Sequence, residues 1–373
     1  MKIKLNSKEL VERIQHLSSV ILSSNTLPIL DNFLFELYPG VLKITASDLE
    51  NTMIVKMEVE SDDNISIAIP SRMFLEILKA LPSQPIELNV LGNNLIEIIS
   101  SSGNYSIGYQ NGEEYPKYKH IENPSTITLP TNVLERAIKK TVFACGSDDL
   151  RPVMNGVLFQ MKTSGMTFVA TDAHRLVKYS RTDHHSSNDI DFVVPKKPLN
   201  ILKSMLGSSD APAVEIQHNE SNAAFLFGDY EMKVRLVDAK YPNYEAVIPK
   251  NNSNLFTIDT SMFNSSLKRV SIFSNKQTHQ IAIKQKETVL NLVAEDVDYS
   301  TNGKETLVCE PDGEGIEIGF NSRFLSEALS NIDDSRVVLE TSMPNRAGIV
   351  RPEKNYEDGE ELLMLVMPVM LNK

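Results

Sequence analysis

Apolar residues recur at every third or fourth position in three segments about 125 residues apart, and this spacing predicts one amphipathic helix in each segment. These positions are Leu10, Ile14 and Leu17; Leu134, Ile138 and Val142; and Phe263, Leu267 and Val270. Asn6 with Glu9, and Asn132 with Glu135, have the spacing of an N-cap residue and its N3 partner. We therefore expect these asparagines to cap the first two helices.

Short apolar runs separated by turn residues follow the first of these helices. Residues 33–37 and 41–44 flank a Pro39-Gly40 turn, and residues 86–90 and 95–99 form a similar pair further on. Such runs predict antiparallel hairpins. A second helix is expected after each of Pro70, Pro195 and Phe320, because apolar residues return four positions later, at Phe74, Leu199 and Phe324.

Three landmarks keep their order and spacing through the chain, which indicates an internal repeat. Pro70, Pro195 and Phe320 are 125 positions apart, Asp48, Asp172 and Asp296 are 124 apart, and Pro116, Pro242 and Pro368 are 126 apart. The repeat predicts an α+β protein with three similar domains, each with two helices packed on antiparallel sheets. We expect the domains to span residues 1–121, 127–248 and 251–373.

The composition is that of a globular protein: 41% of the 373 residues are hydrophobic and 23% are charged. No run approaches the roughly 18 apolar residues that cross a membrane, and the N-terminus lacks an apolar signal segment, so we expect a cytoplasmic protein without a membrane partner. Cys145 and Cys309 lack neighbours at metal-ligand spacing. We therefore expect buried thiols, no metal and no cofactor.

Charge divides between the predicted helices and the rest of the chain. The helices carry thirteen basic and five acidic residues, a net charge of +8, whereas the whole chain carries −12. Basic helices in an acidic protein are typical either of a solvated face or of a surface that attracts nucleic acid. The residues expected to face DNA are Arg72, Arg136, Lys139, Lys196, Lys197, Lys203, Lys268 and Arg269.

Helix dimensions limit how such a chain could surround a duplex. Six helices packed side by side at roughly 8 to 10 Å leave no bore, whereas twelve leave a bore of about 24 Å. We therefore expect two chains to close head to tail as a dimeric ring with the helices lining the pore. No motif that reads bases is present, so the expected contacts are with phosphates and independent of DNA sequence.

Several longer stretches make the chain resemble the beta subunit of bacterial DNA polymerase III, the sliding clamp family. The resemblance covers essentially all 373 residues. It is strongest in residues 26–30, Thr45–Glu50 (TASDLE), residues 155–159, Ala170–Leu176 (ATDAHRL), residues 236–244 and Met367-Pro368.

The resemblance implies the DNA clamp fold, a non-enzymatic processivity factor without catalytic residues, and a homodimer on double-stranded DNA. It also implies a clamp loader complex and partners that dock short peptides: the catalytic subunit of DNA polymerase III, repair polymerases, mismatch-repair proteins and ligase. The implied dimer contact joins Tyr105 and Ile107 to Ile272 and Phe273 of a second copy.

The resemblance places a peptide groove, rich in methionine, beside the third domain. Methionine side chains adapt their shape to varied ligands, as a shared docking site requires. The implied groove residues are Met154, Thr171, His174, Arg175, Leu176, Pro242, Val247, Asn321, Phe324, Met343, Leu365, Met367, Pro368, Val369, Met370 and Leu371.

Some positions depart from the family pattern. Ala246 and Thr278 replace an arginine and an aromatic residue of some members, and Ala173 replaces a turn glycine, so peptide preference is expected to differ. Ser24 and the pair Pro152-Val153 replace basic and aromatic residues of loops near DNA.

Other interpretations remain open at the level of sequence. A hydrolase would need a phosphate-binding, GxSxG or HExxH motif, and none is present. A three-repeat scaffold that never encircles DNA is the main alternative.

His174 with its neighbours fits a strand-end turn better than a catalytic dyad, and residues 183–185 (Asp-His-His) fit an exposed loop better than a metal site. The apolar C-terminus from Leu362 to Leu371 has the pattern of an edge strand interrupted by Pro368.

Overall fold

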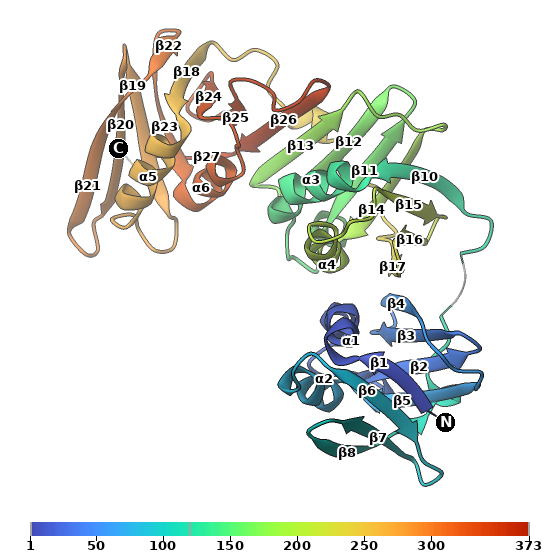
Figure 1. The fold of residues 1–373 in the computed structure, drawn as a ribbon. Helices are drawn as coiled ribbons and strands as arrows, with labels where there is room; N and C mark the ends of the chain where they lie inside the picture. The colour runs from blue at the N-terminus through green and yellow to red at the C-terminus, as the bar shows by residue number, and fades with distance from the viewer. Residues whose placement is uncertain (1, 119–120, 372–373) are drawn as a thin grey trace. The chain divides into compact units, whose positions relative to one another are not determined.

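The computed structural model describes residues 2–118 and 121–371. Within these residues the fold has six α-helices, two in each sequence repeat, and antiparallel sheets (Figure 1). The helices are α1 (Ser7–Ile14), α2 (Ser71–Ala80), α3 (Thr131–Thr141), α4 (Lys196–Leu206), α5 (Thr260–Ser271) and α6 (Ser322–Ser330). The α+β class and the helix pair in each repeat are thus confirmed.

By packing, the chain divides into two compact units that cut across the sequence repeats. The first unit comprises Met1–Glu135 with Lys197–Leu236, and the second comprises Arg136–Lys196 with Val237–Lys373. Each unit contains one nine-stranded sheet and one smaller sheet.

The first unit has a four-stranded sheet and a nine-stranded sheet. The four-stranded sheet has the order β1 (Lys2–Asn6), β6 (Pro85–Val90), β7 (Leu95–Ser100), β8 (Gly103–Gly108). The nine-stranded sheet has the order β10 (Ser125–Pro130), β15 (Ala213–His218), β16 (Asn222–Phe227), β17 (Tyr230–Arg235), β4 (Asn51–Glu58), β3 (Val41–Ser47), β2 (Asn32–Tyr38), β5 (Ile65–Pro70), β9 (Gln110–Asn111).

The second unit repeats this plan. Its nine-stranded sheet has the order β14 (Ile190–Pro195), β11 (Gly156–Lys162), β12 (Gly165–Thr171), β13 (Arg175–Arg181), β26 (Glu360–Val366), β25 (Gly348–Pro352), β24 (Arg336–Thr341), β18 (Asn254–Asp259), β22 (Glu310–Asp312). The five-stranded sheet has the order β21 (Thr301–Val308), β20 (Val289–Asp296), β19 (Gln280–Lys286), β23 (Ile316–Asn321), β27 (Pro368–Val369).

Each nine-stranded sheet joins two sequence repeats through one antiparallel strand pair. Strand β4 of the first repeat pairs with β17 of the second, with Met53 opposite Met232. Strand β13 of the second repeat pairs with β26 of the third, with Leu176 opposite Leu365. Neighbouring repeats are thus connected by backbone hydrogen bonds as well as by side chains.

The helices bury the apolar stripes that the sequence predicted. Leu10 and Ile14 of α1 and Phe74 of α2 are fully buried, and the ring of Phe74 meets that of Phe35 on β2 edge to face at 5.4 Å. Burying each such side chain contributes about 1.5 to 3 kcal/mol. Leu17 and Val142 are also buried, but they lie in 3₁₀ turns that follow α1 and α3.

Only one of the two predicted helix caps is confirmed. The side chain of Asn6 accepts hydrogen bonds from the backbone N–H groups of Lys8 and Glu9 and caps α1. The prediction for Asn132 is wrong, because α3 begins one residue earlier, at Thr131. The hydroxyl of Thr131 instead donates to the carbonyl of Ala211, 2.5 Å away.

The prediction of a C-terminal edge strand is also wrong. Residues 360–366 form β26, which pairs with β13 on one side and β25 on the other and is therefore interior to its sheet. Pro368 lies beyond that strand and begins the two-residue β27, at the edge of the five-stranded sheet. A proline lacks the N–H that an interior strand needs, so the chain changes sheet at this point.

Cys145 and Cys309 are buried free thiols, and burial raises the pKa of Cys145 to about 12.

No helix in the described part of the chain is long and apolar enough to cross a membrane.

Candidate functional site

Four of the cations expected to face DNA have no ion-pair partner among the described residues. They are Arg72 on α2, Lys139 on α3, Lys203 on α4 and Lys268 on α5. Three of them are exposed and Lys203 is half-buried. Their charges are available to an external anion such as a phosphate.

Three further cations of this set are engaged within the protein. The Nζ of Lys196 donates to the carbonyl of Cys145 at 3.1 Å. The Nζ of Lys197 forms an ion pair of 2.6 Å with Asp48, a largely buried carboxylate. The guanidinium of Arg269 donates to both carboxylate oxygens of Glu305, at 2.7 and 2.6 Å. These residues therefore interact with a DNA phosphate less readily than the first four.

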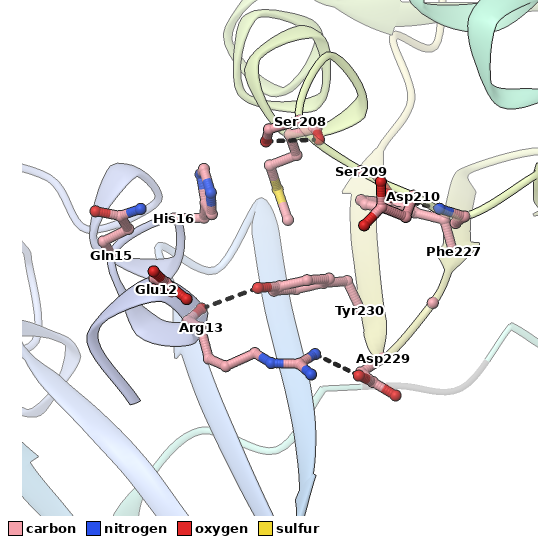
Figure 2. Close-up of a pocket in the computed structure, with 13 residues that line it drawn as sticks. Glu12, Arg13, Gln15, His16, Ser208, Ser209, Asp210, Phe227, Asp229 and Tyr230 are labelled. Atoms are coloured by element: carbon pink, nitrogen blue, oxygen red, sulfur yellow. Dashed lines mark hydrogen bonds and ion pairs between the residues drawn. The ribbon is translucent and has the colours of Figure 1, made fainter. Parts of the chain in front are cut away.

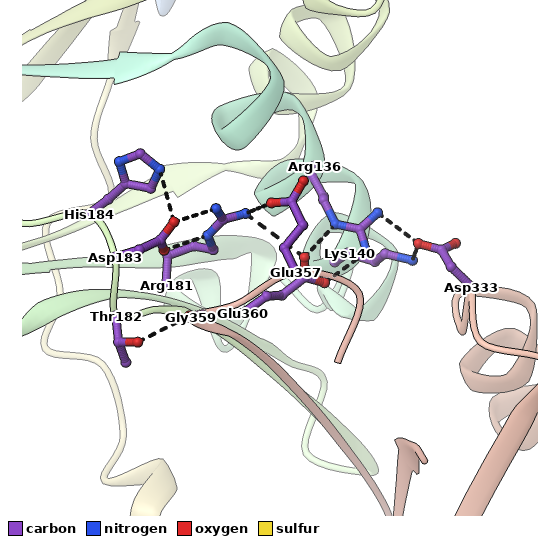
Figure 3. A network of polar contacts seen from close by, with 10 residues as sticks. All are labelled: Arg136, Lys140, Arg181, Thr182, Asp183, His184, Asp333, Glu357, Gly359 and Glu360. Atoms are coloured by element: carbon purple, nitrogen blue, oxygen red, sulfur yellow. Dashed lines mark hydrogen bonds and ion pairs between the residues drawn. The ribbon is translucent and has the colours of Figure 1, made fainter. Parts of the chain in front are cut away.

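The prediction that Arg136 faces DNA is corrected by the structure. Its guanidinium donates to both oxygens of Glu360, at 2.9 and 2.8 Å, and to Asp333 at 2.7 Å (Figure 3). The ring of Tyr356 covers the guanidinium at 4.2 Å. Burial opposes the charge, but the hydrogen bonds to Glu360 and Asp333 outweigh it and raise the pKa of Arg136. A cation neutralised in this way is not available to phosphates.

Lys140 belongs to the same network and was not singled out from the sequence. Its side chain is almost completely buried, and its Nζ contacts Asp333 at 2.8 Å and the carbonyl of Asn331 at 2.6 Å. Burial lowers the pKa of Lys140 despite these contacts. A signal was available, because Lys140 follows Val133 and Ala137 at the helical spacing of a buried stripe.

The network continues to the loop that was weighed as a metal site. Arg181 donates to both oxygens of Asp183, at 2.8 and 2.6 Å, and to Glu357 at 2.6 Å. These hydrogen bonds hold the pKa of Asp183 at about 2, and His184 lies 3.4 Å from the same carboxylate (Figure 3). Among the described residues, no group of three or more metal-ligating side chains is found.

Several residues of the implied peptide site meet where β13 begins and β26 ends. The backbone N–H of Met367 donates to the carbonyl of His174 at 2.8 Å. The imidazole of His174 is stacked on the ring of Phe324 at 6.1 Å, and the guanidinium of Arg175 lies over that ring at 4.8 Å. The hydroxyl of Thr171 donates to the carbonyl of Arg175 at 2.6 Å. Strand ends and α6 thus place four side chains at one location.

An apolar cluster lies under this location. Leu176 and Leu365 are opposite each other on β13 and β26, and both are buried. Other buried members of the cluster are Leu158, Val169, Val193 and Ala347, and the flanking residues include Val153, Tyr241, Tyr244 and Ile248. Leu176 and Leu365 therefore form part of a floor, and they can contact a ligand only through a small area.

Besides Pro242, four apolar side chains of the implied site are exposed. They are Val247, Met343, Met367 and Met370, of which Met370 is 70% exposed. Val247 adjoins Ile248, which packs against the buried cluster, and the backbone of Met367 is hydrogen-bonded to that of His174. Exposed apolar side chains at such positions are suited to contact a binding partner.

The C-terminal residues of the site are held by the five-stranded sheet. Pro368 and Val369 lie opposite Phe320 and Gly319 on β23. A Cβ atom at Gly319 would collide with the carbonyl of Val369 and the side chain of Leu371, so this close approach requires glycine.

The remaining residues of the implied site lie in three separate segments of the chain. Pro242 is exposed, next to Tyr241, whose hydroxyl donates to the carbonyl of Val169 at 3.3 Å. Asn321 caps α6 and donates through its amide to the carbonyl of Thr278 at 3.3 Å. The carbonyl of Met154 accepts a hydrogen bond from Gly146.

The four residues of the implied dimer contact differ in exposure. Ile272 and Phe273 follow α5, and Ile272 is 77% exposed. Tyr105 is half-exposed on the edge strand β8. The side chain of Ile107 is only 3% exposed, so a contact of this residue with a second copy would be made by its backbone on the edge strand.

Sequence models of all three domains of the DNA polymerase III beta subunit match consecutive parts of the chain. The N-terminal domain matches residues 1–119, the central domain residues 128–243 and the C-terminal domain residues 245–369. The chain belongs to the DNA polymerase III beta subunit family.

Individual relatives agree along the whole length of the chain. It is 26% identical over 372 residues to the beta sliding clamp of Vibrio cholerae, and the alignment covers 100% of both chains. It is 26% identical over 385 residues to the beta sliding clamp of Bacillus subtilis, with 99% of both covered. The crystal structure of the DNA polymerase III subunit beta from Pseudomonas aeruginosa has a TM-score of 0.93 with 25% identity, covering 100% of both chains.

Membership of this family accounts for the repeat and for the helix pair in each repeat. The departures noted in the sequence lie at the surface of this family member: Ala246 is exposed in the 3₁₀ turn beside Val247, and Thr278 is exposed before β19. Ala173 adopts a φ of 75°, in the left-handed region that favours glycine, and two hydrogen bonds from neighbouring N–H groups to Asp172 stabilise this turn.

Proposed function

We infer that this protein is a DNA sliding clamp, a processivity factor whose two copies close head to tail around duplex DNA. It works as an accessory subunit of DNA polymerase III in the cytoplasm, without catalysis of its own. The alternative of a scaffold that never meets DNA does not account for cations on four different helices that lack partners in the described chain.

The observation that carries this proposal is the pairing rule between repeats. Each repeat consists of two halves, and each half has one helix followed by strands. The last strand of one half pairs with the last strand of another, as β4 with β17 and β13 with β26. The corresponding strands that remain are β8 in the first repeat and β21 in the third, and each is the edge of its sheet. Unpaired edges favour pairing with another chain. Strand β8 of one copy therefore pairs with β21 of the other, twice in a closed dimer.

The repeat also fixes the expected register of that pair. Strand β17 corresponds to β8 at an offset of 127 residues, since Tyr109 and Leu236 donate equivalent hydrogen bonds at the ends of these strands. Strand β4 corresponds to β21 at an offset of 250, which matches the buried residues Met57 and Leu307. The pair Met232 and Met53 then becomes Tyr105 opposite Gly303 of the partner copy.

This register agrees with the packing around Gly303. The ring of Phe273 lies so close to Gly303 that a Cβ atom there would overlap it. Tyr105 of one copy would then meet Phe273 of the other across Gly303, an aromatic contact of the kind that dominates protein interfaces.

In the closed ring the helices line the bore and present Arg72, Lys139, Lys203 and Lys268 to DNA. Contacts of these side chains with phosphates are independent of sequence and sensitive to salt, which permits sliding. On the outer surface, the exposed group around His174 and Met367 receives a short peptide of a partner. We propose the clamp loader complex, the catalytic subunit of DNA polymerase III, repair polymerases, mismatch-repair proteins and ligase as users of this surface.

A test of DNA topology decides between clamp and scaffold. The protein is loaded on a nicked circular plasmid, separated by gel filtration at high salt, and measured again after the plasmid is linearised. A clamp stays on the circle and leaves the linear DNA within minutes. Equal retention on both forms, or on neither after efficient loading, would contradict encirclement.

A further inference from the structure

A cavity lies within the first unit, where the first and second repeats meet. It is separate from the docking surface described above. It has a volume of about 500 Å³ (Figure 2). The walls come from the C-terminal half of α1, the residues that follow α4, and the turn between β16 and β17. Its lining includes Glu12, His16, Met205, Asp210, Phe227 and Tyr230.

A smaller cavity in the second unit occupies the corresponding place between the second and third repeats. It measures about 210 Å³ and is lined by Arg136, Lys140, Asp333 and Glu360, among others. Helices α1 and α3 begin at equivalent residues, Ser7 and Thr131, so Glu12 corresponds to Arg136 and His16 to Lys140.

The wall opposite these residues carries an aspartate at the equivalent position in both cavities. The N–H of Thr131 donates to the carbonyl of Pro212, as that of Thr260 does to the carbonyl of Ser335, so Asp210 corresponds to Asp333. Asp333 is neutralised by Lys140 at 2.8 Å and by Arg136 at 2.7 Å. In the larger cavity the chain supplies no cation at these two positions.

The charges of the larger cavity are consequently unbalanced. Arg13 is engaged in an ion pair with Asp229 (Figure 2). Glu12 lies 3.8 Å from Lys8 at the surface. Burial lowers the pKa of His16, so its imidazole is neutral at pH 7. Asp210 has no ion-pair partner within the described residues.

Aromatic rings complete the wall. The rings of Phe227 and Tyr230 are stacked at 5.8 Å, and that of His16 meets Tyr230 edge to face at 6.4 Å. In the smaller cavity the guanidinium of Arg136 lies between carboxylates and the ring of Tyr356 at 4.2 Å. Carboxylates beside an aromatic face are the partners that a guanidinium prefers.

We propose that this cavity binds an arginine side chain of a partner polypeptide, which takes the place that Arg136 has in the smaller cavity. The guanidinium pairs with Asp210 and Glu12 and lies against the ring of Tyr230. The site is independent of ring closure and of the peptide surface around His174, so it goes beyond the proposed function.

The test uses the full-length protein with ¹³C-labelled methionine methyl groups and the probe acetyl-Gly-Arg-Gly-amide. The signal of Met205, assigned by its loss in Met205→Leu, should shift saturably with the probe. The same tripeptide with citrulline in place of arginine keeps the shape without the charge and should bind at least tenfold more weakly. Asp210→Asn should weaken binding of the arginine probe roughly fivefold.

The matched control places two basic side chains of the protein itself in the cavity. Glu12→Arg with His16→Lys supplies the two cations of the smaller cavity opposite Asp210, so it should abolish probe binding and raise the melting temperature. A partner-type peptide with a glutamine and apolar or aromatic residues, Gln-Leu-Ser-Leu-Phe, should bind this variant as it binds the wild type, which separates this site from the docking surface. Absence of a saturable Met205 shift, equal binding of the citrulline probe, or undiminished binding to the double variant would each overturn the proposal.

Discussion

Arg136 and Glu360 form two parallel hydrogen bonds that tie α3 of the second repeat to β26 of the third. The guanidinium donates from Nε at 2.9 Å and from Nη2 at 2.8 Å, and the Glu360 side chain is almost completely buried. Bidentate pairs of this kind are strong and geometrically specific. Removal of the Glu360 carboxylate would take away both of these bonds and leave Asp333 as the remaining carboxylate partner of the largely buried Arg136.

Glu360→Gln should therefore destabilise the protein by about 3 kcal/mol, the usual cost of breaking a buried pair. Urea denaturation measures this change. The matched control is Glu361→Gln, because Glu361 is the exposed neighbour on the opposite face of the strand and should change stability by less than about 0.5 kcal/mol. Equal effects of the two substitutions would show that the network adds nothing to stability.

This network marks the limit of what the sequence could predict. The charge count identified α3 as basic, but whether Arg136 points to solvent or to Glu360 depends on β26, more than 200 residues away in the chain. Ile107 illustrates the same limit. It lies on an edge strand, as predicted, but the alternation of the strand turns its side chain into the core.

Local chemistry was predicted better than long-range pairing. Asn6 caps its helix because the signal is complete within four residues, whereas Asn132 resembles a cap although the helix has already begun at Thr131. Pro368 correctly excluded an interior strand at its own position, but the seven residues of β26, which ends at Val366, are interior. The arginine-binding cavity could not be predicted, since its walls come from three distant segments.

The structure separates the basic residues proposed to face DNA into two groups with different expected effects. Lys139→Glu with Lys203→Glu should weaken DNA binding equally for all sequences and reduce the slope of log K against log salt by about two or more. Fluorescence anisotropy with two unrelated duplexes at several salt concentrations measures both. Lys286→Glu makes one such substitution on strand β19 and serves as the control for each single lysine. If the control had the same effect, the helices would not be the DNA-facing surface.

Lys197→Glu tests the second group. Because Lys197 pairs with the largely buried Asp48, this substitution places two carboxylates together and should lower the melting temperature by several degrees. Lys139→Glu should leave the melting temperature unchanged. Differential scanning fluorimetry of the two variants distinguishes a structural cation from a free one.

Glu305 should contribute to stability in a manner that depends on pH. Hydrogen bonds from Arg269 and Ser266 hold its pKa at about 2, below the ordinary value of about 4.3. A depressed carboxyl pKa stabilises the folded state above the ordinary value, and this contribution is lost as the pH falls toward 2. Glu305→Gln should therefore lower the melting temperature more at pH 7 than at pH 3. An equal decrease at both pH values would contradict the ion pair.

The dimer contact should depend on exposed apolar side chains at the end of α5. Ile272→Ala with Phe273→Ala should raise the dimer dissociation constant roughly a hundredfold, since truncation of central interface residues commonly costs 2 kcal/mol or more. Sedimentation velocity over a range of concentrations measures this change. Met262→Ala removes another exposed apolar side chain of α5 and should leave the dimer intact. An unchanged dimer in the double variant would contradict the proposed strand pairing.

Removal of residues 370–373 should separate encirclement of DNA from partner docking. Met370 is 70% exposed and Leu371 packs against Gly319, so the truncation removes part of the docking surface and leaves the edges β8 and β21 untouched. The truncated protein should remain dimeric and stay on nicked circles. Its affinity for a Gln-Leu-Ser-Leu-Phe peptide should fall more than tenfold, because apolar anchors carry most of such binding energy.

Fluorescence polarisation with the labelled peptide measures this loss, and stimulation of the polymerase should disappear with it. The matched control removes only Asn372 and Lys373, which lie outside the described residues, and keeps Met370 and Leu371. This shorter truncation should bind the peptide like the full chain. If both truncated proteins retained full affinity, the peptide would dock away from the C-terminus, and the exposed group around His174 and Met367 would need another function.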